Sequence, residues 1–181
     1  MSASLEGISN EIKEANAHDV RGETKREKYL IFSLLDENYG MPLSTVKEVI
    51  GLTEITKVPN VAEYFKGIFN LRGKIISVFD LRTKLRLPKA DYKEKKTCII
   101  IVEIDGLVLG TIVDDVSAVS GFVQGQIERH LDIESPVSRE FVTGVAKTEE
   151  KKLTLLLDIG KVLSVEDLKL AKANTIGRRA S

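Results

Sequence analysis

The two halves of this 181-residue chain repeat one pattern of short apolar strands separated by turns. Residues 45–49 match 112–116, residues 66–68 match 143–145, and residues 75–81 match 153–159. The strand at 75–79 is apolar on both faces, so both faces must be buried. Small sheets of this kind bury both faces best by curling into barrels, which also removes exposed strand edges. The repeat therefore predicts an all-β fold built from two small barrels of similar construction.

Structural residues recur at matching places in the two halves, as expected of residues that the fold requires. Asp80 and Asp158 each follow a buried strand, where a carboxylate can cap a short helical turn. Gly67 recurs as Gly144, which predicts a bulge or tight bend at both positions. We therefore expect all four residues to support the backbone.

Two dipeptides predict tight hairpin turns. Arg72-Gly73 separates strands expected at 67–71 and 74–79, and Asp105-Gly106 separates strands expected at 98–104 and 107–113. Gly73 tolerates the backbone angles that such turns demand, and Asn70 is most simply a turn former.

The arginine of the first turn has no counterpart in the second half, where the matching turn at 149–152 carries two glutamates and two lysines. A guanidinium held on a short turn loses little entropy on binding, and its planar fork favours specific geometry. We therefore expect Arg72 to recognise a partner. The alternative is a buried ion pair that steadies the turn, with Glu48 as the candidate carboxylate.

Domain boundaries follow from where the repeat begins and ends. Residues 1–27 are polar and predict a mobile N-terminal tail, whereas an amphipathic docking helix with Leu5, Ile8 and Ile12 on one face is the alternative. The folded region is expected at 28–163, with a first barrel at about 28–90 and a second at about 96–160 that could exchange a terminal strand. Residues 164–181 predict a C-terminal helix and tail, in which Ser164 and Asp167 hold capping positions.

Composition limits the classes of partner. The 27 basic and 27 acidic residues balance, so the chain as a whole does not attract nucleic acid. A possible basic strip consists of Arg82, Lys84, Arg86 and Lys89. It keeps open one alternative function, a small barrel that binds RNA or single-stranded DNA. The aromatic content of 6% and the absence of Trp count against stacking on bases.

No group of residues has the spacing of a catalytic or metal site. His18 and His130 are far apart, and the neighbouring Asp114 and Asp115 would point to opposite faces of a strand. The single Cys98 lies among apolar residues, which predicts an inert buried thiol in a reducing compartment. No apolar run approaches the roughly 18 residues of a membrane span. We therefore expect a cytoplasmic protein that is not an enzyme and holds no metal or cofactor.

One stretch identifies a family. Residues 67–73 followed by 75–82 resemble the signature of CheW-type chemotaxis coupling proteins, and 39–43, 46–49, 53–59 and 113–116 follow the expected order. The resemblance covers about residues 28–163, and Ser77 departs from it because the family usually has proline there. It implies two SH3-like five-stranded β-barrels packed side by side. It also implies a non-enzymatic adaptor that couples the CheA histidine kinase to transmembrane chemoreceptors and is recruited to membrane receptor arrays.

The resemblance also implies the binding residues. The helical tip of the receptor would dock in the groove between the barrels, at positions matching Val46, Glu48, Gly67, Asn70 and Arg72. The regulatory domain of CheA, which has the same fold, would pair with an apolar barrel end. We expect Val113, Val116 and Val119 there if their side chains are exposed. The resemblance implies neither binding to nucleic acid nor direct insertion into a membrane.

Overall fold

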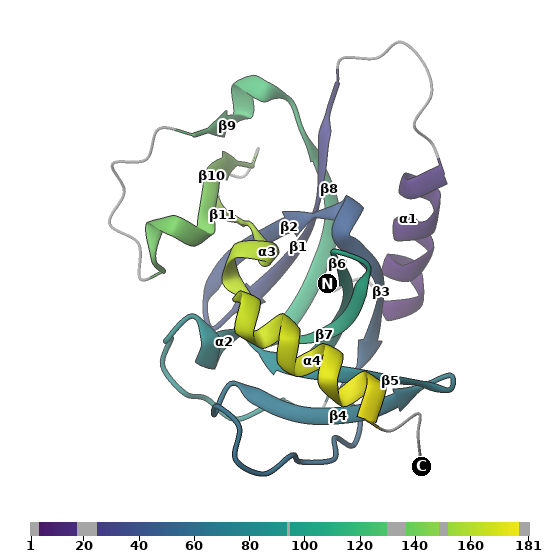
Figure 1. The fold of residues 1–181 in the computed structure, drawn as a ribbon. Helices are drawn as coiled ribbons and strands as arrows, with labels where there is room; N and C mark the ends of the chain where they lie inside the picture. The colour runs from purple at the N-terminus through teal and green to yellow at the C-terminus, as the bar shows by residue number, and fades with distance from the viewer. Residues whose placement is uncertain (1–3, 18–24, 94, 130–136, 149–151, 178–181) are drawn as a thin grey trace.

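The strands form two sheets that pack against each other (Figure 1). The structure is a computed structural model that describes residues 4–17, 25–93, 95–129, 137–148 and 152–177. The five-stranded sheet has the order β3 (Val46–Gly51), β6 (Cys98–Ile104), β7 (Leu107–Val113), β5 (Lys74–Asp80) and β4 (Phe65–Leu71). The six-stranded sheet has the order β8 (Asp115–Phe122), β1 (Glu27–Leu34), β2 (Glu37–Pro42), β11 (Leu153–Leu157), β10 (Val142–Lys147) and β9 (Ile127–Glu128). The predicted all-β fold of two barrel-like units is confirmed.

The sheets mix strands from both halves of the chain. β1 and β2 join β8, β10 and β11, whereas β6 and β7 join β3, β4 and β5. The order β3-β6-β7-β5-β4 thus corresponds strand for strand to β8-β1-β2-β11-β10. This corrects the expected division into barrels at about 28–90 and 96–160. The β1–β2 hairpin of the first half joins the barrel of the second half, and the β6–β7 hairpin of the second half joins the barrel of the first, whereas only one terminal strand was expected to exchange.

Three apolar clusters follow from strands that bury both faces. On β6, Ile99 and Ile101 belong to a cluster within the five-stranded unit, whereas Ile100 and Val102 face the largest cluster, which contains residues from both sheets. On β1, Tyr29 and Ile31 likewise belong to a third cluster within the six-stranded unit. Each unit therefore has a small interior of its own, and the main core lies between the two units.

The predicted turns and caps are present. Arg72 and Gly73 have φ values of 49° and 85°, and Asp105 and Gly106 have 51° and 76°. Positive φ at both central residues is the type I′ geometry that suits a two-residue hairpin. Register shifts at 65/67 on β4 and 142/144 on β10 show the bulges expected at Gly67 and Gly144.

The two predicted aspartate caps hold matching single-turn helices. Asp80 caps α2 (Leu81–Lys84) by accepting from the N–H of Thr83 at 3.2 Å. Asp158 caps α3 (Ile159–Val162) by accepting from the N–H of Lys161, also at 3.2 Å. The short helices η1 (Leu43–Thr45), η2 (Gln124–Gln126) and η3 (Arg139–Phe141) complete the connections between strands.

The N-terminal region differs from the expected mobile tail. Residues Leu5–Ala17 form the helix α1, and its Ile8 and Ile12 side chains are completely buried in the main core. The amphipathic docking helix is therefore the correct interpretation of this segment. Most of its other side chains are exposed, so burial of two isoleucines rather than helix propensity accounts for its position.

A buried carboxylate anchors the C-terminal helix α4 (Val165–Gly177), which crosses the front of the five-stranded sheet in Figure 1. Ser164 and Asp167 form the predicted reciprocal cap, with N–H to oxygen distances of 2.8 and 3.3 Å. Asp167 also accepts from the Lys84 ammonium at 2.6 Å and from the Tyr64 hydroxyl at 2.8 Å. No helix among the described residues is long and apolar enough to cross a membrane.

Candidate functional site

Arg72 and Glu48 form a two-pronged ion pair on the surface. Nη1 and Nη2 of Arg72 lie 2.7 and 2.6 Å from Oε1 and Oε2 of Glu48. The hydrogen bonds from Arg72 hold the pKa of Glu48 below its usual value, and the carboxylate in turn raises the pKa of the guanidinium. The Arg72 side chain is 71% exposed, so the pair is not the buried ion pair considered as an alternative. Its charges remain available to a partner.

The pair borders a shallow hollow of about 370 Å³ in the five-stranded unit. Its apolar lining consists of Leu71, Ile76, Ile101 and Val108. Its charged lining consists of the Arg72–Glu48 pair together with Lys47, Lys74 and Glu103. Lys47 and Glu103 form an ion pair at 2.8 Å. An apolar floor with a rim of both charges suits recognition of a protein surface.

Only three of the five residues expected to bind the receptor lie together on this surface. Glu48 and Arg72 are paired, and Asn70 is exposed beside them, with its Oδ1 accepting from the N–H of Gly73 at 2.8 Å. Val46 is 1% exposed within the main core, so its side chain cannot contact a partner in this conformation. Gly67 is buried with φ of 138°, and an added Cβ would lie 2.1 Å from the carbonyl oxygen of Thr56. Its role is conformational.

The residues expected at the kinase interface are also mostly internal. Val113 and Val116 are buried in the main core, and only Val119 is partly exposed. The expectation that all three offer an apolar docking surface is wrong for the first two, because these strands bury both faces. Sequence reasoning instead missed the half-buried Leu71 and Val108, which flank the two hairpin turns. Proximity to a turn is the signal that could have identified them.

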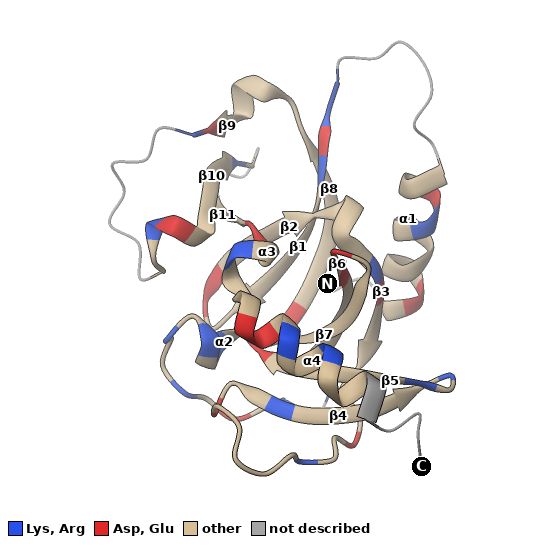
Figure 2. Ribbon diagram, in the orientation of Figure 1, with Lys and Arg blue, Asp and Glu red and all other residues tan. Residues whose placement is uncertain are grey.

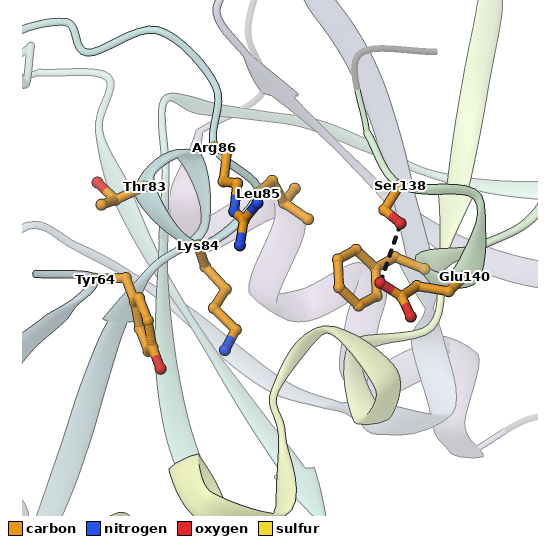
Figure 3. Close-up of a pocket in the computed structure, with 8 residues that line it drawn as sticks. Tyr64, Thr83, Lys84, Leu85, Arg86, Ser138 and Glu140 are labelled. Atoms are coloured by element: carbon orange, nitrogen blue, oxygen red, sulfur yellow. Dashed lines mark hydrogen bonds between the residues drawn. The ribbon is translucent and has the colours of Figure 1, made fainter. Parts of the chain in front are cut away.

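A second hollow, of about 550 Å³, lies between the two units (Figure 3). Tyr64, just before β4, lines it together with Thr83, Lys84, Leu85 and Arg86 of the segment around α2, and the segment around η3 contributes Ser138, Glu140 and Phe141. Ser138 donates to Glu140 at 3.0 Å, as the dashed line in Figure 3 shows. No histidine or cysteine is among the described residues that line this hollow.

The possible basic strip is largely neutralised. Arg82 is 4% exposed and pairs with Asp114, Lys84 pairs with the buried Asp167, and Lys89 pairs with Glu63. Only Arg86 among the four is an exposed cation without an ion pair to a described residue. Figure 2 shows acidic and basic residues interspersed on the same elements. The electrostatic argument for nucleic-acid binding is therefore weak.

Metal and thiol chemistry have no visible site in the described part of the chain. Within it, no three His, Cys, Asp or Glu side chains are grouped to hold a metal ion. Cys98 is buried as predicted, and burial raises the pKa of its thiol to about 11. A thiol in this environment stays protonated near neutral pH and is a poor nucleophile.

Comparison with known proteins agrees with this geometry. The model of the CheW-like domain matches residues 28–167. The chain belongs to the CheW-like family. A chemotaxis protein CheW from Klebsiella aerogenes is 34% identical over 156 residues, covering 86% of this chain and 93% of that protein. The chemotaxis protein CheW of Bacillus subtilis is 30% identical and covers 77% and 88%, respectively.

A solved structure supports the same assignment. The crystal structure of scaffolding protein TtCheW from Thermoanaerobacter tengcongensis superposes with a TM-score of 0.72 and 36% identity, covering 79% of this chain and 96% of that one. These CheW relatives identify the chain as a chemotaxis scaffold or adaptor rather than an enzyme. The CheW-like match begins at residue 28, so the helix α1 lies outside it.

Proposed function

We propose that this protein couples chemoreceptors to the CheA histidine kinase by binding both at once, and that its partners recruit it to membrane receptor arrays. The observation that carries the proposal is the exposed Arg72–Glu48 pair beside an apolar hollow, in a chain of the CheW-like family. Such an adaptor makes and breaks no covalent bond. Its individual contacts need only be modest in strength, because many copies act together in an array.

The receptor is proposed to contact the surface formed by Glu48, Asn70 and Arg72. These residues come from β3 and from the β4–β5 hairpin, which hold them on rigid strands rather than on a long loop. The type I′ turn fixes the backbone of Arg72 before binding, so little entropy is lost when the guanidinium engages a partner.

The kinase is proposed to contact an apolar barrel end through its regulatory domain. Of the valines considered for this role, Val119 on β8 is the one with an accessible side chain. The half-buried Leu71 and Val108 line the hollow beside Arg72 and are therefore assigned to the proposed receptor surface instead. Two separate surfaces on the two units would allow one adaptor to hold both partners.

Titration of a receptor cytoplasmic hairpin fragment into the purified protein tests the receptor surface. Arg72→Ala is expected to weaken binding by about tenfold or more, since a charged, centrally placed arginine is lost. Arg86→Ala is the matched control, because Arg86 is also exposed and also has a positive φ, 59° against 49°. Equal affinity of the Arg72→Ala and wild-type proteins would remove Arg72 from the receptor interface.

A further inference from the structure

The helix α1 lies across the boundary between the two units. It packs against β3, the end strand of the five-stranded sheet, and against β8, the end strand of the six-stranded sheet (Figure 1). β3 and β8 occupy equivalent places in the two strand orders. The surface under α1, here called the α1 seat, therefore spans the edges of both barrels.

The contacts of α1 are those of a helix in a groove. Ile8 and Ile12, one helical turn apart, are both completely buried and join the cluster that contains Val46 and Val49 of β3. The Ser9 hydroxyl donates to the carbonyl of Val49 at 3.4 Å, and the Lys28 ammonium donates to the carbonyl of Ala15 at 3.3 Å. The seat thus accepts an amphipathic helix through two apolar side chains spaced four residues apart.

The α1 seat adjoins the surface proposed to bind the receptor. β3 contributes both Val49, which contacts α1, and Glu48, which pairs with Arg72. Lys13 of α1 lies near enough that its charge adds to the effect of the Arg72 hydrogen bonds in lowering the pKa of Glu48. A partner helix that reached from Glu48 along β3 would meet α1.

The attachment of α1 is slight for an element of the core. Apart from Ile8 and Ile12, its side chains are exposed or half-buried. Glu11 and Glu14 of α1 and Val119 and Gly121 of β8 line one open hollow of about 450 Å³. The CheW-like match begins at residue 28 and does not include this helix.

We propose that α1 occupies a helix-binding groove in place of a partner helix, and that an amphipathic helix of the receptor hairpin displaces it. This inference rests on the proposed function. The receptor then binds only the fraction of molecules in which α1 has left, and its apparent affinity falls by that fraction. Because α1 and its seat belong to the same chain, the effective concentration of α1 is high, so even a weakly held helix competes.

Two variants of α1 test the competition. Ile8→Glu with Ile12→Glu places two carboxylates where only apolar side chains fit, and so releases the helix. Asn10→Glu with Asn16→Glu adds the same charge to exposed positions of the same helix and serves as the control. With a receptor hairpin fragment as titrant, we expect the first variant to bind at least about threefold more tightly than wild type and the control to bind like wild type. A synthetic peptide of residues 4–17, added to the first variant, should return its affinity toward the wild-type value.

Other outcomes have clear meanings. Unchanged or weaker binding by the Ile8→Glu, Ile12→Glu variant, with wild-type binding intact, would overturn the competition and leave the proposed function standing. Absence of binding by every form would overturn the proposed function and this inference with it. Hydrogen exchange of the wild-type protein provides a second test that needs no variant. Addition of the hairpin fragment should speed exchange at the amides of α1, and unchanged or slower exchange there would contradict displacement.

Discussion

Arg82 and Asp114 form a largely buried ion pair that links the two sheets. Nε of Arg82 lies 3.0 Å from Oδ1 of Asp114, and the Arg82 side chain is 4% exposed. The other carboxylate oxygen of Asp114 accepts from the N–H of Leu35 at 2.6 Å, in the turn between β1 and β2. Arg82 lies in α2, after β5 of the five-stranded sheet, whereas the turn with Leu35 joins two strands of the six-stranded sheet. Asp114, between β7 and β8, therefore holds the two units in register.

Replacement of this carboxylate should be strongly destabilising. Asp114→Ala leaves the Arg82 charge buried without its partner, and we expect the free energy of unfolding to fall by about 3 kcal/mol. Asp115→Ala is the matched control, since Asp115 forms no ion pair with any residue that the structure describes, and should change stability by less than about 1 kcal/mol. Urea unfolding of both variants measures the difference. Equal losses would show that the Arg82–Asp114 contact contributes little.

Asp167, the carboxylate that anchors α4, should make the free energy of unfolding depend on pH. Burial alone raises the pKa of Asp167, but hydrogen bonds from Lys84, Tyr64 and the Ser164 N–H outweigh it, so the pKa lies below the ordinary value of 3.8. A carboxyl with a depressed folded pKa stabilises the protein fully above the unfolded pKa and loses this contribution as pH falls through the folded pKa. Wild-type stability in urea should therefore decline as pH drops below about 4.

The Asp167→Ala variant separates the contribution of Asp167 to this pH dependence from the contributions of other acidic side chains. At neutral pH we expect it to lose about 3 kcal/mol of unfolding free energy, because Lys84 is left largely buried without a partner. Between pH 5 and pH 2, roughly, its stability should fall less steeply than that of wild type. The double variant Lys84→Met, Asp167→Ala should recover part of the loss. Parallel pH profiles for wild type and Asp167→Ala would contradict the assignment.

The two bulge glycines should differ in their tolerance of a side chain. Gly67→Ala places a Cβ 2.1 Å from the Thr56 carbonyl oxygen at a φ of 138°, and we expect a loss of roughly 3 kcal/mol. Gly144→Ala places its Cβ 2.9 Å from the Ile127 side chain and 3.1 Å from the Glu128 carbonyl oxygen, a milder overlap at a φ outside the left-handed region, so a smaller loss of about 1 kcal/mol is expected. Thermal unfolding of the two variants side by side measures the contrast, and a smaller loss for Gly67→Ala would reverse it.

Features set by neighbouring residues could be predicted from the sequence. The hairpin turns at Arg72-Gly73 and Asp105-Gly106 follow from local backbone preferences, and all four residues have the positive φ of such turns. The caps at Asp80 and Asp158 were predictable because each carboxylate needs only the N–H three residues later.

Features that depend on distant pairing could not be predicted in the same way. The two halves carry similar strand patterns, so local sequence cannot say which copy of β1–β2 or β6–β7 joins which sheet. Two isoleucines in a short polar helix give the same sequence pattern whether the helix docks or stays free, so the pattern alone does not distinguish α1 from a tail. The burial of Val46 and Val113 cannot be predicted either, because an apolar residue on a strand does not reveal whether a second layer covers it.

The central claim, that the protein works as a bridge, is tested most directly by a three-component retention experiment. The regulatory domain of CheA is immobilised, and a receptor cytoplasmic hairpin fragment is applied with and without this protein. We predict that the receptor fragment is retained only when the protein is present, that Arg72→Ala reduces retention, and that Arg86→Ala does not. A receptor fragment that stays unbound, although each partner binds the protein separately, would contradict the account.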